Sequence, residues 1–356
     1  MTRMTGRRWC SVMGAIALTA TLSGCWLMPG YGPDRTGAQT QATAISPGSI
    51  GHLAQRWEVD TGDGAVSGVT VSGSGIHATA APGADGVAVI TTLDPGTGSA
   101  RWTQTRSVPS IGLTSAPYSV GGKVYVGYGV GALGGHWVSE SFDPDTGVAG
   151  PGADATLPVA ARNDVVLGLT LSYGSGGPCW ISMRSQDVAA GTGWSQYLYY
   201  GDISSCSTGS ATLGADAIFH AGRGPMAGAE TFTMANGLRR FPLTAAAACS
   251  GSPSACPTWS TALDGTTATA PVLGTDGSVF TGTDAGTIYA VDAATGTIRW
   301  QSSLWSAVTG PPALAGGMLY VPTASGSLAV LPAAGCSASA CSPSWLGTGT
   351  DALVGQ

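Results

Sequence analysis

Residues 276–300 alternate apolar and polar positions over two short stretches that are bounded by turn-forming residues. The stretches around Val279-Phe280-Thr281 and Ile288-Tyr289-Ala290-Val291 have the period of two that is typical of half-buried β-strands. A turn at 292–296 follows, and the next stretch ends at Trp300. The pattern predicts a small antiparallel sheet of short strands joined by tight turns.

Weaker copies of this unit recur along nearly the whole chain, each closed by a tryptophan at the end of the unit. The closing tryptophans are Trp57, Trp102, Trp194, Trp259, Trp300 and Trp345. Most are spaced by about 45 residues, the length of a four-stranded propeller blade. The wide gap after Trp102 divides into two such units near Gly147, and the gap after Trp194 carries extra loop. Six blade-length intervals result.

A turn of the form Asp-x-x-Thr-Gly stands before the last strand of three units. It begins at Asp94, Asp143 and Asp292 and ends at Gly98, Gly147 and Gly296. The aspartate accepts hydrogen bonds from backbone N–H groups of the turn, and the glycine takes the positive φ that closes the hairpin. A calcium loop would need several carboxylates at alternating positions, and only Asp143 and Asp145 approach that pattern. We therefore interpret these residues as turn formers.

The composition fits many short strands better than charged amphipathic helices. Charged residues make up 10% of the chain, 56 residues are glycine, and 43% are hydrophobic, which is enough apolar surface to fold. We predict an all-β fold, a β-propeller of four-stranded antiparallel blades, with six repeats counted and six to eight blades possible. Residues 49–356 form one domain in this prediction, and the closing tryptophans pack between neighbouring blades.

The first residues have the pattern of an export signal. Arg3, Arg7 and Arg8 precede an apolar stretch from Ser11 to Leu22, and Leu22-Ser23-Gly24-Cys25 ends it. This resembles the lipobox of bacterial lipoproteins, which implies that Cys25 carries the lipid and that residues 1–24 are removed; an ordinary cleaved signal is the alternative. Residues 25–48 are polar and without period, so we expect a flexible lipidated tether and a place on the extracytoplasmic face of the cell membrane.

Six cysteines remain after the signal and the expected lipid acceptor, an even number that fits an oxidising compartment. Cys249 and Cys256, and likewise Cys336 and Cys341, flank short loops before a closing tryptophan, and Cys179 and Cys206 are left to pair. Zinc is the rival interpretation, but the spacings are not those of metal knuckles, and the four histidines are scattered. We expect three disulfides and no metal.

The repeats resemble the quinoprotein-type (PQQ-like) β-propeller family, in particular its short lipid-anchored bacterial members of the BamB-like kind. The resemblance is strongest at 268–300. Quinone dehydrogenases of that family hold their cofactor against a disulfide of adjacent cysteines, beside calcium and a catalytic aspartate. This sequence has no adjacent cysteine pair. We therefore expect no cofactor and no catalytic residues; a PQQ-dependent oxidoreductase is the alternative.

The function expected from these features is a monomeric, lipid-anchored scaffold that binds envelope proteins or cell-wall polymer. The formal net charge is −6 before the basic signal is removed, so nucleic acid is not an expected partner. His77 and His220 stand within predicted strands, where we expect packed histidines. A second alternative is a carbohydrate-binding surface formed by aromatic residues of the divergent units: Trp137, Tyr173, Trp180, Tyr197, Tyr199 and Tyr200.

Overall fold

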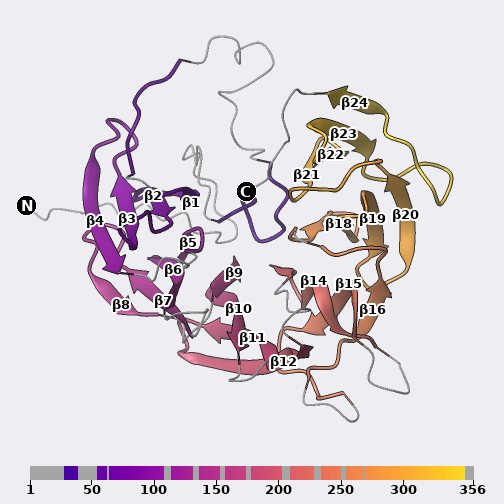
Figure 1. Ribbon diagram of the computed structural model, residues 1–356, viewed down its shortest axis with the longest axis horizontal. Coiled ribbons are helices and arrows are strands. Elements are labelled where there is room, and N and C mark those ends of the chain that lie inside the picture. The colour runs from indigo at the N-terminus through magenta and orange to yellow at the C-terminus, as the bar shows by residue number, and fades with distance from the viewer. Residues whose placement is uncertain are drawn as a thin grey trace, which may run out of the picture.

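In the computed structural model, four-stranded antiparallel sheets follow one another along the chain and stand around a common centre (Figure 1). The structure describes residues 28–38, 54–61, 64–107, 114–130, 136–152, 157–173, 178–202, 209–227, 234–249, 254–267 and 269–348. Within these residues there are six such sheets, here called blades 1 to 6 in chain order, and no helix that could span a bilayer. The predicted all-β propeller of four-stranded blades is confirmed.

The first three blades cover the N-terminal half of the ring. Blade 1 consists of β1 (Val66–Ser72), β2 (Gly75–Ala80), β3 (Val87–Leu93) and β4 (Ala100–Ser107). Blade 2 consists of β5 (Tyr118–Val120), β6 (Lys123–Val130), β7 (His136–Phe142) and β8 (Ala149–Pro151). Blade 3 consists of β9 (Leu157–Arg162), β10 (Val165–Tyr173), β11 (Pro178–Asp187) and β12 (Thr192–Asp202).

The other three blades complete the described sheets. Blade 4 consists of β13 (Ser210–Leu213), β14 (Ala217–Pro225), β15 (Met234–Pro242) and β16 (Trp259–Ala262). Blade 5 consists of β17 (Val272–Leu273), β18 (Ser278–Gly282), β19 (Thr287–Asp292) and β20 (Ile298–Ser303). Blade 6 consists of β21 (Ala313–Ala315), β22 (Met318–Pro322), β23 (Ser327–Pro332) and β24 (Trp345–Thr348).

Each blade runs up and down, with its first strand toward the middle of the ring and its fourth along the rim, as β9 and β12 show (Figure 1). Two faces follow from this order. The turn face carries the turns between the first and second strands and between the third and fourth. The connector face carries the turns between the second and third strands and the connections from one blade to the next.

Tryptophans from the fourth strands fasten neighbouring blades to each other. The indole Nε1 of Trp102 donates to Pro144 O (2.9 Å), that of Trp194 to Leu243 O (2.9 Å) and that of Trp259 to Ala293 O (3.1 Å). Each acceptor lies after the third strand of the next blade. The rings of Trp102 and Trp259 also need a glycine there, because a Cβ at Gly147 or at Gly296 would lie 2.7 Å from the ring.

The two tryptophans at the ends of this series differ from the rest. Trp57 lies outside any strand, yet its Nε1 donates to Pro95 O of blade 1 at 3.2 Å. Trp345 starts β24 and is 56% exposed, whereas Trp300 is 2% exposed. The expectation that Trp345 packs between blades therefore needs correction: no sheet follows blade 6 among the described residues, so no next turn receives its ring.

Two disulfides close loops that lie between a third and a fourth strand, as their spacing predicts: Cys249–Cys256 in blade 4 and Cys336–Cys341 in blade 6. Each loop pairs with the rim strand of the preceding blade. Ala255 N donates to Tyr197 O (2.7 Å) of β12, and Cys341 N donates to Gln301 O (2.8 Å) of β20. The loops therefore cover backbone groups of an edge strand that would otherwise be free to pair with another chain.

Residues 28–38 lie in the middle of the ring, where the indigo segment in Figure 1 crosses the inner ends of the blades. Leu273 N of β17 donates to Asp34 O (2.9 Å), and Leu314 N of β21 donates to Thr36 O (2.6 Å). We expected residues 25–48 to form a flexible tether. The described part of that range is instead hydrogen-bonded to the propeller, because its carbonyls satisfy N–H groups of inner strands.

Candidate functional site

The connector face is held in shape by side chains that tie each connection to the neighbouring turn. Asp264, which follows β16, accepts hydrogen bonds from Thr283 Oγ1 (2.9 Å) and Thr287 Oγ1 (2.6 Å) at the turn between β18 and β19. Asp284 of the same turn accepts from Thr266 N at 2.8 Å. These bonds fix the connector between blades 4 and 5 on blade 5 itself, so the face is a defined surface.

Trp305 stands on this face in the connector between blades 5 and 6. It is 92% exposed, and its φ is 59°. The backbone on either side is fixed, since Leu304 N donates to Gly286 O (2.7 Å) and Val308 N to Thr283 O (3.0 Å). A bulky residue in the left-handed region is strained, and such outliers gather at binding and active sites. The connector therefore holds a large apolar ring in water at a cost in backbone energy.

Blades 3 and 4 have longer strands than blade 5. The strands β11 and β12 have 10 and 11 residues, and β14 and β15 have 9 each, whereas β18 has 5. The additional pairs of β14 and β15 run from Gly222↔Gly237 to Pro225↔Met234. Because β14 ends at the connector side, these pairs raise a wall on the connector face.

Arg239 fills the base of this wall and is fully buried. Its Nε donates to Pro225 O (2.6 Å), Nη1 to Gly222 O (2.7 Å) and Nη2 to Gly224 O (2.7 Å). It also donates to Gly237 O and Ala235 O, so its backbone acceptors come from both strands of the hairpin. Burial, with the nearby Arg223 charge, lowers the pKa of Arg239 to about 9, which leaves it protonated at neutral pH.

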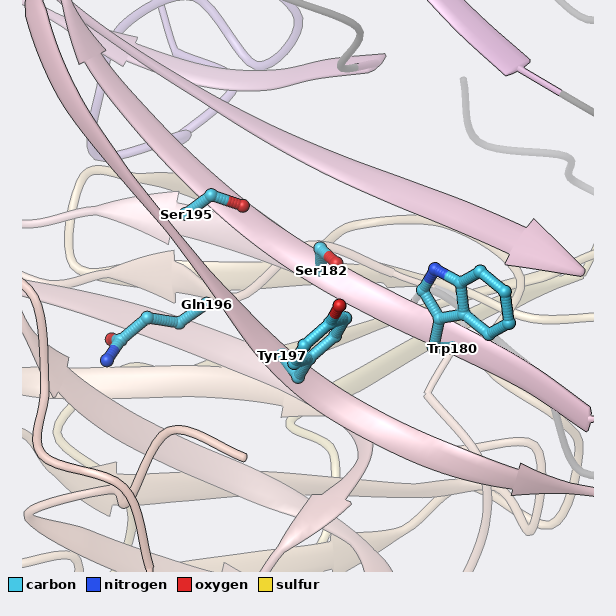
Figure 2. A pocket seen from close by; sticks show the side chains of 5 residues that line it. All are labelled: Trp180, Ser182, Ser195, Gln196 and Tyr197. Atoms are coloured by element: carbon cyan, nitrogen blue, oxygen red, sulfur yellow. The ribbon is translucent and has the colours of Figure 1, made fainter. Parts of the chain in front are cut away.

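A shallow hollow of about 190 Å³ lies on the rim strands of blade 3. Trp180 and Ser182 from β11 and Ser195 and Tyr197 from β12 line it, and the Trp180 and Tyr197 rings stand over neighbouring strands (Figure 2). Tyr197 is 44% exposed. Gln196 lines its edge and holds the segment that leads into the Cys249–Cys256 loop, since its Oε1 accepts from Ala246 N at 2.7 Å.

Among the described side chains, the hollow is not lined by the other aromatic residues of the expected carbohydrate surface. Tyr199 is 3% exposed and packs inside blade 3, with the Arg223 guanidinium 5.9 Å from its ring centre. The side chains of Trp137, Tyr173 and Tyr200 lie outside the described residues. Two rings, Trp180 and Tyr197, therefore make up the described apolar part of this surface.

His77 is fully buried in blade 1, between two hydroxyl groups. Its Nε2 is 2.8 Å from Ser72 Oγ and its Nδ1 2.7 Å from Thr92 Oγ1. Burial, with the Arg101 charge as a smaller cause, lowers its pKa to about 4. The ring is therefore neutral at physiological pH, and both of its nitrogens have hydrogen-bond partners inside the blade. His220 is also fully buried, in β14.

The aspartates of the predicted turns bond to their own turn and to an arginine. Asp292 Oδ1 accepts from Thr295 N (2.9 Å), and its Oδ2 accepts from Arg299 Nη2 (2.7 Å), which lowers its pKa to about 2. Asp94 has the same partners in Thr97 and Arg101, and its pKa is also lowered. Asp143 Oδ1 accepts from Thr146 N at 2.9 Å. In the described part of the chain no three His, Cys, Asp or Glu residues gather as a metal site would need.

Two cysteines of the predicted set lie outside the described residues: Cys25, the expected lipid acceptor, and Cys206. Cys179, which was expected to pair with Cys206, is disulfide-bonded. Three features of the structure were not predicted from the sequence: Trp305, Arg239 and the docking of residues 28–38. The sequence did contain an indication of Trp305, since this tryptophan follows the closing Trp300 by only a few residues and lies outside the alternating strand pattern. It contained no indication of Arg239, because a buried arginine satisfied by carbonyls leaves no partner pattern in the sequence.

The chain is similar to one protein-family model and to several solved structures. A family model described as "Outer membrane protein assembly factor BamB" matches residues 251–335. Over these residues, which include the whole of blade 5, the sequence matches that family model. The crystal structure of BamB from Moraxella catarrhalis is similar over 81% of this chain and 76% of its own length, at 16% identity and a TM-score of 0.51. Quinohemoprotein alcohol dehydrogenase from Comamonas testosteroni is similar over 93% and 68%, at 13% identity and a TM-score of 0.64. No curated protein matches the sequence.

The residues present do not fit the quinone cofactor that a resemblance to quinone dehydrogenases would imply. The chain has no adjacent cysteines, and the described disulfides join residues five and seven positions apart. The described acidic side chains at Asp94 and Asp292 are held by turns and arginines. No chemical step is therefore derived through a quinone.

Proposed function

We propose that this protein is a non-enzymatic, lipid-anchored envelope propeller that binds another envelope protein through its connector face. The observation that carries the proposal is Trp305, a 92% exposed indole on a strained backbone between two fixed connector segments. Tryptophan is one of the residue types enriched among those that contribute most to protein interfaces once a partner buries them. The family model over residues 251–335, described as an outer membrane protein assembly factor, supports a protein-binding role.

The geometry around Trp305 favours a protein partner over a small molecule. The ring stands in water on a connector and not in a cavity, whereas small-molecule sites are concave and bury most of the ligand. The wall formed by β14 and β15 rises from the same face and is stiffened by Arg239. A raised, rigid face with an apolar ring gives a partner both shape and a desolvating contact.

The test is crosslinking in intact cells followed by recovery of the full-length protein from membranes. The wild-type protein should recover a defined set of partners, and Trp305→Ala should lose them. Trp345→Ala is the matched control, because Trp345 is also exposed, at 56%, but starts β24 at the turn face. Equal recovery by both variants, or no defined partner for the wild type, would overturn the proposal.

Membrane attachment through Cys25 is part of the proposal and is tested separately. The supporting observation is the Leu22-Ser23-Gly24-Cys25 sequence after an apolar stretch. The wild-type protein should float with membranes in a density gradient, and Cys25→Ala should stay in the soluble fraction. Flotation of Cys25→Ala to the same extent would count against lipidation.

A carbohydrate-binding role is the second candidate, because the hollow on blade 3 carries two aromatic rings beside hydroxyl groups. Cell-wall fragments should then quench tryptophan emission, and Tyr197→Ala should abolish the quenching while Trp305→Ala keeps it. The oxidoreductase alternative is tested by titration with pyrroloquinoline quinone and calcium. The scaffold proposal expects no spectral change and no dye-linked activity.

A further inference from the structure

We infer that residues 28–38 are a latch that holds the turn face of the propeller toward the membrane, so that the connector face points away from it. The inference rests on the proposed lipidation of Cys25. Two properties carry it: the latch is bound to the inner strands by backbone and side-chain contacts, and it begins three residues after the expected lipid acceptor.

The latch is folded on itself before it meets the blades. Tyr31 N donates to Met28 O (3.0 Å), Arg35 N to Gly32 O (2.9 Å) and Gly37 N to Gly30 O (2.9 Å). Tyr31 and Arg35 both have positive φ, at 79° and 55°. Such backbone persists in a bulky residue only when its surroundings hold it. The loop therefore has a defined shape, which a free tether of the same length would lack.

Charged side chains fasten the latch to blades 2 and 3. Arg35 is 8% exposed; its Nη2 donates to Tyr118 Oη of β5 at 3.1 Å and also to Val159 O of β9. Asp34 forms an ion pair with Arg162, whose Nε also donates to Leu213 O of blade 4 at 3.1 Å. A buried guanidinium with such partners is costly to release, because it would leave the Tyr118 hydroxyl without its charged donor.

Met28 marks where the latch leaves the propeller. It is 4% exposed and packs with Val120 at the end of β5 and Val166 near the start of β10, with Val188 beside them. Val188 follows β11, before the turn into β12. All three neighbours lie at the turn face, so the chain enters the latch from that side.

The distance from Met28 to the lipid is limited by covalent geometry. Three peptide steps separate Cys25 from Met28, and each spans at most 3.8 Å, so the two Cα atoms lie within about 11 Å of each other. A wide ring attached near the centre of one face by so short a link cannot turn over, because its rim meets the bilayer first. The turn face therefore stays against the membrane, and Trp305 is presented to partners on the far side.

The test uses the full-length lipidated protein in membranes, with a photocrosslinking amino acid at one exposed position on either face. Val148, which is 65% exposed in the turn before β8, reports the turn face. Ala285, exposed between β18 and β19, reports the connector face. Lipid adducts should form several-fold more often from position 148 than from position 285. Equal adducts from both positions in protein that floats with membranes would overturn the latch.

Two variants separate the latch from the anchor. Asp34→Ala with Arg35→Ala should reduce the preference for position 148 while flotation is kept; Asp216→Ala, which removes an exposed ion pair with Arg240, is the matched control.

If the double variant does not fold, an insertion of about twenty Gly and Ser residues after Leu27 leaves the latch intact and lengthens the link by about 25 Å. It should lower the preference as well, and an unchanged preference would overturn the inference. Loss of flotation in the wild type would overturn the lipidation and the orientation together, whereas equal adducts in protein that floats would overturn the latch alone.

Discussion

The indole Nε1 of Trp300 donates a hydrogen bond to Ala333 O, 3.1 Å away on the next blade. Gly335 lies against the same ring, where a Cβ would lie 2.2 Å from its Cδ1. The position of the ring is therefore fixed by its hydrogen bond to Ala333 O and by the space that Gly335 leaves. This relationship joins blade 5 to blade 6, and it recurs through Trp102 with Gly147 and through Trp259 with Gly296. The Trp194 ring makes the same kind of hydrogen bond, to Leu243 O, at a turn without a glycine.

Replacing Trp300 by alanine should lower the free energy of unfolding by about 3 to 5 kcal/mol, because a buried ring and its hydrogen bond are lost and a cavity remains. Trp345→Ala should cost about 1 kcal/mol or less, since more than half of that ring is already in water. Urea denaturation of both variants measures the difference. Equal losses would contradict the interpretation that blade 6 has no partner for its tryptophan among the described sheets.

His77 should make the protein less stable as the pH falls from about 6.5 to about 4. In the unfolded chain the histidine takes up a proton near pH 6.5, whereas in the folded protein burial lowers its pKa to about 4. The unfolded state therefore binds more protons in this interval, which removes about 3 kcal/mol of stability by pH 4. His77→Gln should have a flatter profile there when unfolding is measured against pH.

The aspartates titrate at lower pH than His77, so their effect on stability can be separated from that of the histidine. Asp94 and Asp292 have lowered pKa values in the folded protein, so their contribution is lost below the ordinary aspartate pKa of 3.8. A slope between pH 6.5 and 4 that is the same in the wild type and in His77→Gln would show that His77 is not its source.

The disulfide between Cys336 and Cys341 should stabilise the loop that pairs with β20. Replacing both cysteines by serine should cost about 2 kcal/mol, because the short loop regains its freedom in the unfolded chain. The backbone amide of residue 341, which donates to Gln301 O, should also exchange its hydrogen faster in the variant. Hydrogen exchange at this position in the wild type and in the double variant measures the effect, with amides of β6 in blade 2, which belongs to another sheet, as the internal reference.

The sequence predicted the repeat because its cause is local. A tryptophan near the start of the fourth strand packs on the turn after the third strand of the next blade, and a glycine in that turn leaves room for the ring, so Trp259 and Gly296 are both visible in the pattern. The latch was not predictable in this way, since Arg35 meets Tyr118 and Val159, which lie 83 and 124 positions along the chain. Its polar composition fits a tether equally well. The exposure of Trp345 likewise depends on which sheet comes next, and not on its own unit.

Arg239 should be essential for the wall on the connector face, although it touches no acidic side chain in its described contacts. Arg239→Leu leaves carbonyls of Gly222, Gly224 and Pro225 without their donor inside the protein, which should cost at least about 3 kcal/mol. Arg240→Leu is the matched control: its partner Asp216 is 78% exposed, so the loss should be less than about 1 kcal/mol. Urea denaturation and hydrogen exchange of the β14–β15 amides measure both effects. Because the wall lies on the face that carries Trp305, Arg239→Leu should also weaken partner recovery, whereas Arg240→Leu should not. A protein that keeps its stability without the Arg239 guanidinium would show that the wall is held by strand pairing alone.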